Sequence, residues 1–242
     1  MEKMNDLLEL GKQYKSTKDR AGFLEIYSNY FNDYKHKEIN ILEIGIDKGE
    51  SLKIWRKYFT RAKICGIDII DIKFQIEGVD LIKADQTDKK ALKGICDKYK
   101  GFDIIIDDGG HYSKQIVISL NFLFDYLNDN GLYIVEDLQT SYFRRFGGSR
   151  LNLNKKTTSM NYLKSIADSI NYEHNDKPFF SSKKFDGMVK YIHFYQNVAI
   201  LKKGKSVNYF YKDTKNTSYI IDKLKKLLFN FYNELSKNGF FK

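Results

Sequence analysis

The residues Phe102-Asp-Ile-Ile-Ile-Asp-Asp-Gly-Gly-His111 and Gly131-Leu-Tyr-Ile-Val-Glu-Asp137 decide the fold of this chain. Each stretch contains an apolar run rich in β-branched residues, and a pair of carboxylates follows that run. Apolar runs without alternation are typical of strands that are buried on both faces of a parallel sheet. Residues 116–127, between the two stretches, carry apolar side chains at helical spacing. The sequence therefore predicts a strand–helix–strand unit within a parallel sheet.

The acidic residues of this unit lie where its strands end. The carboxyl ends of parallel strands meet at one edge of an open α/β sheet, and such sheets bind their ligands there. We therefore expect Asp107, Asp108, His111, Glu136 and Asp137 to converge on one crevice.

Residues 39–51, Ile-Asn-Ile-Leu-Glu-Ile-Gly-Ile-Asp-Lys-Gly-Glu-Ser, indicate a strand, a glycine loop and the start of a helix. Gly45 and Gly49 allow a sharp turn and a close approach of a ligand to the backbone. Ser51 is placed to help cap the helix that follows. The spacing lacks both the Gly-x-Gly-x-x-Gly run of dinucleotide sites and the Lys-Ser/Thr of a P-loop. This loop therefore suits a ligand that carries no phosphate at that point.

Two further predicted strands end in acids. Residues 62–68 end at Asp68, and residues 79–86 end at Asp85 and Gln86. An acid at the end of the second strand can accept hydrogen bonds from ribose hydroxyls. A single Asp in such a place is often only a helix N-cap. Acids at the ends of five successive strands are harder to assign to capping alone: Glu43, Asp68, Asp85, Asp107 with Asp108, and Glu136 with Asp137.

At these residues the chain resembles the class I S-adenosylmethionine-dependent methyltransferases. The match lies in Leu42-Glu-Ile-Gly-Ile-Asp-Lys-Gly49 and Gly66-Ile-Asp-Ile69. More narrowly, the chain is similar to the metal-dependent sugar O-methyltransferases of the macrocin and mycinamicin type and to relatives in bacterial surface-sugar clusters. Residues 106–113, 135–143, 146–148 and 189–203 carry this narrower resemblance, which spans residues 17–203.

The resemblance implies a doubly wound, mostly parallel, Rossmann-like α/β sheet with a C-terminal antiparallel strand pair. It also implies two cofactors, S-adenosylmethionine and a divalent metal, with Mg²⁺ the expected ion. Asp108, Glu136 and Asp137 would hold the metal, and His111 would be the general base. The residues expected to contact S-adenosylmethionine are Glu43, Gly45, Gly49, Ser51, Asp68, Asp85, Gln86 and Asp107.

Two positions depart from the family pattern. Gln139 stands where the family usually has a histidine, and the region around Ala21 lacks a histidine often found there. These departures affect what the resemblance implies about the identity of the acceptor and the contacts of the N-terminal segment. All the expected metal ligands are present.

We expect three parts along the chain: a helical lid or cap (residues 1–36), the methyltransferase domain (residues 37–204) and a basic amphipathic helical extension (residues 205–242). An aromatic stripe from Phe23 to Phe31 is expected to pack against the sheet. The C-terminal helix is expected to dock on its own domain or form a homo-oligomer rather than touch a membrane. Arg144 and Arg145 lie in a polar segment predicted to cover the acceptor site; they could bind a phosphate or be solvated.

The composition is that of a globular protein, with 42% hydrophobic and 30% charged residues. The formal net charge is +10, but basic and acidic residues are interspersed, which favours a solvated lysine-rich surface over a nucleic-acid partner. Two cysteines form no disulfide framework. Without a signal-peptide pattern or an apolar run long enough to span a bilayer, a cytoplasmic location is expected.

The sequence therefore predicts an S-adenosylmethionine-dependent methyltransferase that acts on a sugar hydroxyl. The acceptor would be a small-molecule, nucleotide-linked or carrier-linked sugar in surface (capsule) polysaccharide or natural-product biosynthesis. Three alternatives stay open: a methyltransferase of an amine or phenol, a nucleic-acid-binding module without turnover, and an iron site. The iron site is weakly supported because His36, His174 and His193 are not grouped with carboxylates in the sequence.

Overall fold

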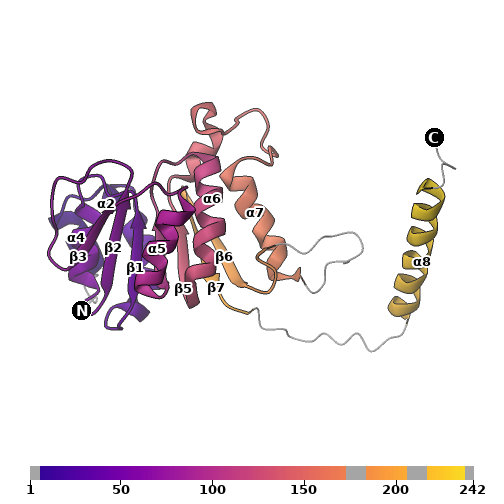
Figure 1. The fold of residues 1–242 in the computed structure, drawn as a ribbon, viewed down its shortest axis with the longest axis horizontal. Coiled ribbons are helices and arrows are strands. Elements are labelled where there is room, and N and C mark those ends of the chain that lie inside the picture. The colour runs from indigo at the N-terminus through magenta and orange to yellow at the C-terminus, as the bar shows by residue number, and fades with distance from the viewer. Residues whose placement is uncertain (1–5, 173–183, 206–216, 238–242) are drawn as a thin grey trace. The chain divides into compact units, whose positions relative to one another are not determined.

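The computed structural model describes residues 6–172, 184–205 and 217–237 (Figure 1). The chain divides into two compact units. The first comprises Met1–Tyr172 and Lys183–Ser206, and the second comprises Glu173–Ser182 and Val207–Lys242. In the second unit the structure describes one helix, α8 (Thr217–Lys237). The candidate site lies wholly within the first unit.

The first unit is built on a seven-stranded sheet with the strand order β3-β2-β1-β4-β5-β7-β6. Strands β1 to β5 pair in parallel, whereas β7 is antiparallel to β5 and β6 is antiparallel to β7. The predicted mostly parallel sheet with a C-terminal antiparallel pair is therefore confirmed. The strands are β1 (Asn40–Ile44), β2 (Lys63–Asp68), β3 (Val79–Lys83), β4 (Phe102–Asp107), β5 (Leu127–Val135), β6 (Val189–Tyr195) and β7 (Val198–Lys203).

The order of the strands reverses between β1 and β4. From β1 the chain moves outward through β2 to β3, then returns to the other side of β1 for β4 and β5. Such a reversal opens a crevice beyond the carboxyl ends of the two central strands, where doubly wound sheets bind ligands. The topology therefore places the acids that follow β1, β2 and β4 around one opening.

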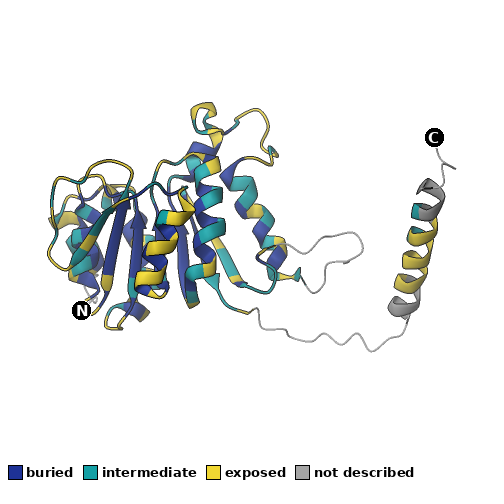
Figure 2. Ribbon diagram, in the orientation of Figure 1, coloured by how far each residue is buried: buried dark blue, intermediate teal, exposed yellow. Residues whose placement is uncertain are grey.

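Helices cover both faces of the sheet, and two apolar cores result (Figure 2). One core lies under α5 (Lys89–Tyr99), α6 (Ser113–Leu123) and α7 (Ser159–Ile170). The other lies under α1 (Asp6–Gln13), α3 (Phe23–Phe31) and α4 (Glu50–Tyr58). Short helical turns complete the chain: α2 (Thr17–Arg20), η1 (Asn32–Tyr34), η2 (Phe124–Tyr126), η3 (Leu138–Tyr142) and η4 (Arg144–Phe146).

The N-terminal helices belong to the second of these cores. Tyr27 and Phe31 are fully buried, with ring centroids 5.1 Å apart, and Phe31 lies 5.6 Å from Trp55 of α4. Fully burying such a side chain stabilises the fold by about 1.5–3 kcal/mol. The predicted packing of the aromatic stripe is confirmed. Its role as a lid stays a prediction.

The remaining expectations concern the cysteines and the C-terminal helix. Cys65 and Cys96 are both free and buried. Along α8, four large apolar side chains are more than half exposed: Leu224, Leu227, Leu228 and Phe231. Among the described helices, none is both long and apolar enough to cross a membrane. The expected docking or dimerisation of α8 stays a prediction.

Candidate active site

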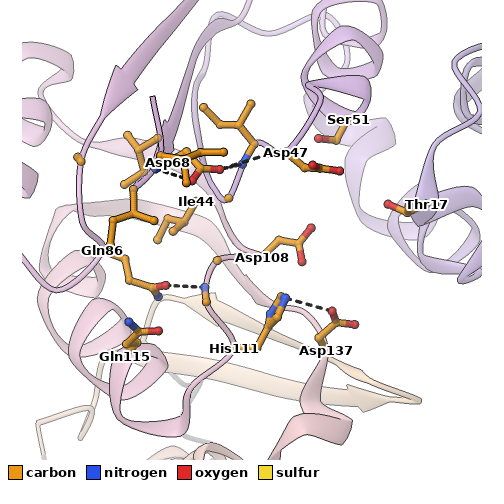
Figure 3. A pocket seen from close by; sticks show the side chains of 18 of the residues that line it. Thr17, Ile44, Asp47, Ser51, Asp68, Gln86, Asp108, His111, Gln115 and Asp137 are labelled. Atoms are coloured by element: carbon orange, nitrogen blue, oxygen red, sulfur yellow. Dashed lines mark hydrogen bonds and ion pairs between the residues drawn. The ribbon is translucent and has the colours of Figure 1, made fainter. Parts of the chain in front are cut away.

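A cavity of about 500 Å³ opens at the carboxyl ends of β1, β2 and β4 (Figure 3). Its wall is formed by the glycine loop after β1, the residues that follow β2 and β3, the loop after β4, and the start of α2. This volume lies within the range of small-molecule sites, about 300–1,000 Å³.

Two backbone loops meet at one end of the cavity. Gly45 has φ +86°, and a Cβ added there would lie 2.1 Å from the carbonyl oxygen of Asp108. Only glycine therefore lets the β1 and β4 loops approach this closely. The Asp68 carboxylate accepts hydrogen bonds from the backbone N–H groups of Ile46 (2.8 Å) and Ile70 (3.1 Å), which fixes the glycine loop beside the end of β2.

This half of the cavity fits an adenosine-containing cofactor. Ile69 and Ile70 are more than half exposed and line the wall, so a flat ring could cover them. Asp68 and Asp85 offer carboxylate oxygens at the same wall. Gln86 accepts a hydrogen bond from the Gly110 N–H at 2.9 Å and so ties the end of β3 to the β4 loop. Gly45, Ser51, Asp68, Asp85 and Gln86, of the expected cofactor-contacting set, line the cavity.

Glu43, Gly49 and Asp107 do not line the cavity, so their predicted direct contact with the cofactor is not supported. Glu43 is fully buried under α4, where its carboxylate accepts hydrogen bonds from Ser51 Oγ (2.9 Å) and Trp55 Nε1 (3.0 Å). A Cβ at Gly49 would meet the side chains of Phe74 and Ile76. Ser51 also differs from expectation: α4 begins at Glu50 after Gly49, so Ser51 braces Glu43 and does not cap the helix.

Asp107 shows why neighbouring acids can have separate roles. It is the last residue of β4 and is buried beneath α6, where it accepts hydrogen bonds from Ser119 Oγ (2.5 Å), Gln86 Nε2 (3.1 Å) and Tyr133 Oη (3.2 Å). Burial raises the pKa of Asp107, while these hydrogen bonds oppose the shift. Successive side chains along a strand point to opposite faces. Asp108 therefore faces the cavity while Asp107 holds the loop in place.

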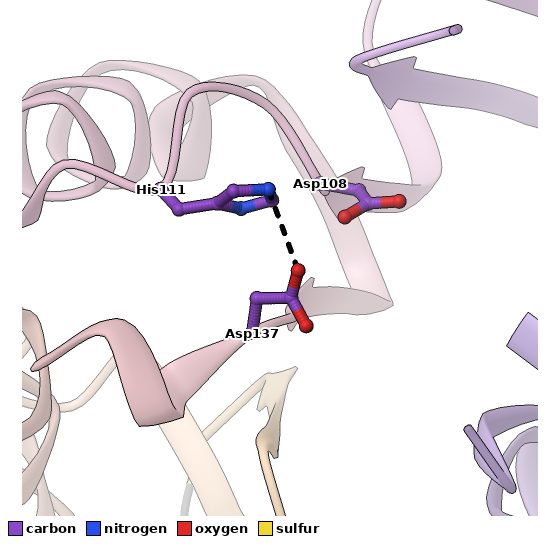
Figure 4. A group of neighbouring side chains, drawn as sticks. All are labelled: Asp108, His111 and Asp137. Carbon is purple, nitrogen blue, oxygen red and sulfur yellow. Dashed lines mark ion pairs between the residues drawn. The ribbon is translucent and has the colours of Figure 1, made fainter. Parts of the chain in front are cut away.

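At the other end of the cavity, His111 and Asp137 face each other, and the Asp108 carboxylate lies next to them (Figure 4). One ligand atom from each lies within 4.8 Å of those of the other two. The His111 Nε2 atom is 3.4 Å from Asp137 Oδ2. All three side chains are partly exposed to the cavity. Two carboxylates that face a shared space are suitable ligands for a hard divalent cation such as Mg²⁺.

The backbone at this group is held in an uncommon conformation. His111 has φ +58° and Asp137 has φ +55°, both in the left-handed region. Such conformations are sparsely populated for residues other than glycine and cluster at functional sites. Thr140 Oγ1 lies 2.7 Å from the Asp137 carbonyl oxygen and 3.1 Å from that of His111, so one hydroxyl bridges both turns. Gln139 donates to Asp137 Oδ1 at 3.0 Å and further fixes that carboxylate.

A buried ammonium lies beside this group. Lys18 Nζ is 2.6 Å from Asp108 Oδ2, 2.7 Å from Glu136 Oε1 and 3.3 Å from Glu43 Oε1. The side chain is only 3% exposed, and it reaches the acids from α2, whose Ser16 N-cap accepts a hydrogen bond from the Lys18 N–H. Burial by itself lowers the pKa of Lys18, but the three carboxylates raise it, and the net direction is upward. The side chain is therefore a cation in this cage.

Glu136 differs from the expectation that it faces a metal beside Asp108 and Asp137. Its carboxylate is almost fully buried and is held by Lys18 Nζ and by the Tyr27 hydroxyl, which donates at 2.6 Å. Burial and the nearby Asp108 raise the pKa of Glu136, while Lys18 and Tyr27 oppose the shift. The described residues that could hold a cation are Asp108, His111 and Asp137, without Glu136.

Sequence reasoning missed Lys18, Tyr27 and Thr140. The polar run Lys15-Ser-Thr-Lys-Asp-Arg20 indicates a solvated turn, and nothing local shows that one of its lysines crosses to strands 90 and 118 residues away. The iron alternative gains no support, because the described residues contain no cluster of two histidines with a carboxylate. His174 lies outside the described residues.

No family model matches the chain. Curated relatives of the chain include two O-methyltransferases. The mycinamicin VI 2''-O-methyltransferase of Micromonospora griseorubida is 34% identical over 219 residues, which cover 83% of this chain and 53% of the relative. The demethylmacrocin O-methyltransferase of Streptomyces fradiae is 34% identical over 212 residues, covering 82% and 53%. The chain thus spans about half the length of these relatives.

A solved structure supports the same relationship. The MycE methyltransferase from the mycinamycin biosynthetic pathway, in complex with Mg and SAH, superposes with a TM-score of 0.78 and 32% sequence identity. The match covers 87% of this chain and 57% of that chain.

Proposed function

Since the chain belongs to the class I S-adenosylmethionine-dependent methyltransferases of the macrocin and mycinamicin type, we propose that it methylates a sugar hydroxyl with the help of Mg²⁺. One observation carries this proposal. One cavity is lined both by the glycine loop with Asp68 and Asp85 and by the cluster of Asp108, His111 and Asp137. The cavity therefore has room for a methyl donor at one end and for a cation and an alcohol at the other.

In this proposal, the glycine loop and Asp68 bind the S-adenosylmethionine. Gly45 lets the cofactor lie against the backbone, and the Asp68 carboxylate is placed to accept hydrogen bonds from ribose hydroxyls. Asp85 and Gln86 line the wall beside Ile69 and Ile70 and would contact the adenine end.

Asp108 and Asp137 would hold the cation, and Glu136 would take part only if Lys18 were displaced. A divalent cation held there would lower the pKa of the acceptor hydroxyl and orient neighbouring oxygens. Lys18, at the cavity wall, holds Asp108 in place and partly neutralises the buried acids.

His111 would be the general base. Its Nε2 atom can accept the hydroxyl proton, and Asp137 Oδ2 at 3.4 Å stabilises the imidazolium that forms. Bound S-adenosylmethionine would supply the methyl group: the hydroxyl oxygen would form a bond to the methyl carbon as the carbon–sulfur bond breaks, with the electron pair of that bond remaining on sulfur.

The two curated relatives described above are named as O-methyltransferases of mycinamicin VI and of demethylmacrocin. For this chain we propose only that the acceptor is a sugar hydroxyl, in either natural-product or surface-polysaccharide biosynthesis.

Methyl transfer from labelled S-adenosylmethionine tests this proposal. We expect the chain to label sugar acceptors in the presence of Mg²⁺, EDTA to abolish labelling, and added Mg²⁺ to restore it, because the cation lowers the barrier to loss of the hydroxyl proton. A panel of sugars, amines and phenols would be compared under both conditions. Undiminished transfer in EDTA, or a preference for amines or phenols, would refute the proposal.

A further inference from the structure

A second cavity, of about 810 Å³, is lined by the segment that follows β5. We call it the arginine pocket, and its principal residues are Tyr142, Phe143, Arg144, Arg145, Arg150 and Lys155. All of them come from η3, η4 and the loop that follows. Nothing in the proposed chemistry of methyl transfer uses this cavity.

The arginine pocket is strongly basic. Residues 138–167 contain six lysines or arginines and no aspartate or glutamate, although the whole chain has 31 acids in 242 residues. Within the described part of the chain, no carboxylate forms an ion pair with Arg144, Arg145 or Arg150. Some surface cations elsewhere have such partners, as Lys83 has in Asp71 and Lys98 in Asp80. The pocket therefore concentrates positive charge that the protein itself does not neutralise.

Aromatic rings hold the guanidinium groups in place. The Arg145 guanidinium lies 4.8 Å from the centroid of the Phe146 ring, and that of Arg150 lies 4.9 Å from the Phe143 ring. Stacking on a ring restricts an arginine while leaving its N–H groups free to donate. A guanidinium presented in this way suits paired hydrogen bonds to phosphate oxygens.

Residues of the segment that forms the arginine pocket also contact His111, the proposed base. The Phe146 ring packs edge-on against His111, with centroids 6.4 Å apart, and it also contacts Tyr112 at 5.3 Å. Thr140, at the start of the same segment, contacts the His111 carbonyl oxygen at 3.1 Å. A ligand with a hydroxyl at His111 could therefore extend past Phe146 toward the arginines.

From these observations we propose that the acceptor carries phosphate, and that the arginine pocket binds this phosphate while the sugar hydroxyl lies at His111. The inference rests on the proposed function and narrows its substrate class. Tyr142 and Leu151 are exposed beside the arginines and offer apolar surface to the rest of the acceptor. The acids of the active site would repel phosphate, so the charged group is excluded from the methyl-transfer end and the acceptor binds in one orientation.

Binding of inorganic pyrophosphate and of uridine diphosphate to the full chain, measured by calorimetry, tests this inference. Both ligands are expected to bind, and uridine, which has no phosphate, is expected to bind far more weakly. Arg150→Met, and the double variant Arg144→Met with Arg145→Met, should each weaken pyrophosphate binding by about tenfold to a hundredfold, because each removes charge-assisted hydrogen bonds. Tighter binding of uridine diphosphate than of pyrophosphate would identify a nucleotide sugar, and equal binding a phosphate on another carrier.

Arg61→Met is the matched control, since Arg61 is an exposed arginine that pairs with Glu38 away from the pocket. It should bind pyrophosphate as the unaltered chain does, and all variants should keep their thermal midpoint. Absence of pyrophosphate binding, an equal loss in Arg61→Met, or displacement of pyrophosphate by duplex DNA at matched phosphate concentration would overturn the inference. Binding of S-adenosylmethionine is measured in the same samples. If the cofactor binds and pyrophosphate does not, the pocket inference alone fails; the reverse result defeats the proposed function instead.

Discussion

His111→Ala is expected to lower kcat by about 10²–10⁴-fold, the usual contribution of a positioned general base. The hydroxyl would lose the acceptor for its proton, while the cofactor end of the cavity would be unchanged. The affinity for S-adenosylmethionine and the thermal midpoint should therefore match those of the unaltered chain. Rates of labelled methyl transfer at saturating cofactor and Mg²⁺ measure the effect.

His193→Ala is a suitable control for this experiment. His193 is exposed on β6, where its Nδ1 atom lies 2.7 Å from the Tyr30 hydroxyl. It has the same imidazole side chain as His111 but does not line the active-site cavity. Its replacement should leave kcat unchanged. A kcat for His111→Ala within a few-fold of the unaltered chain would remove His111 from the role of base.

Lys18→Met is expected to cost the most stability of any single change at the site. The substitution leaves Glu43, Asp108 and Glu136 close together without their ammonium partner. Removing one partner of a buried ion pair typically lowers the free energy of unfolding by about 3–5 kcal/mol. Urea unfolding in EDTA, followed by circular dichroism, measures the difference.

Lys83→Met provides the comparison, because Lys83 pairs with Asp71 but its side chain is 59% exposed. Exposed pairs contribute little in water, so this variant should unfold at nearly the same urea concentration as the unaltered chain. Equal losses in the two variants would show that the Lys18 cage does not stabilise the fold.

The fold could be predicted from the sequence because its signals are local. Unbroken apolar runs such as Ile104-Ile-Ile106 mark strands buried on both faces, and helical spacing between them requires a parallel crossover. Convergence of the strand-end acids then follows from the topology rather than from any motif. In any doubly wound sheet, residues at the carboxyl ends of neighbouring parallel strands lie at the same edge.

The details of the site depend on the direction of individual side chains, which the sequence does not specify. Asp107 and Asp108 are neighbours, yet one braces the loop beneath α6 and the other faces the cavity. Glu136 and Asp137 separate in the same way, because Asp137 takes a left-handed backbone conformation while Glu136 continues inward from β5. The Lys18 contact depends on the tertiary fold alone.

The arrangement of the acids has a consequence for the cation. With Glu136 held by Lys18 and Tyr27, the carboxylates that face the cavity beside His111 are Asp108 and Asp137. Mg²⁺ commonly binds to one or two protein carboxylates and keeps several water ligands. Two carboxylates therefore suffice to hold it and leave positions for acceptor oxygens.

Crystals grown with S-adenosylhomocysteine and Mn²⁺, measured at an X-ray wavelength where manganese scatters anomalously, test the central claim most directly. The account predicts one strong anomalous peak between the Asp108 and Asp137 carboxylates, and the cofactor in the cavity beside Gly45 and Asp68. A peak elsewhere, or a cofactor that lies outside this cavity, would contradict it.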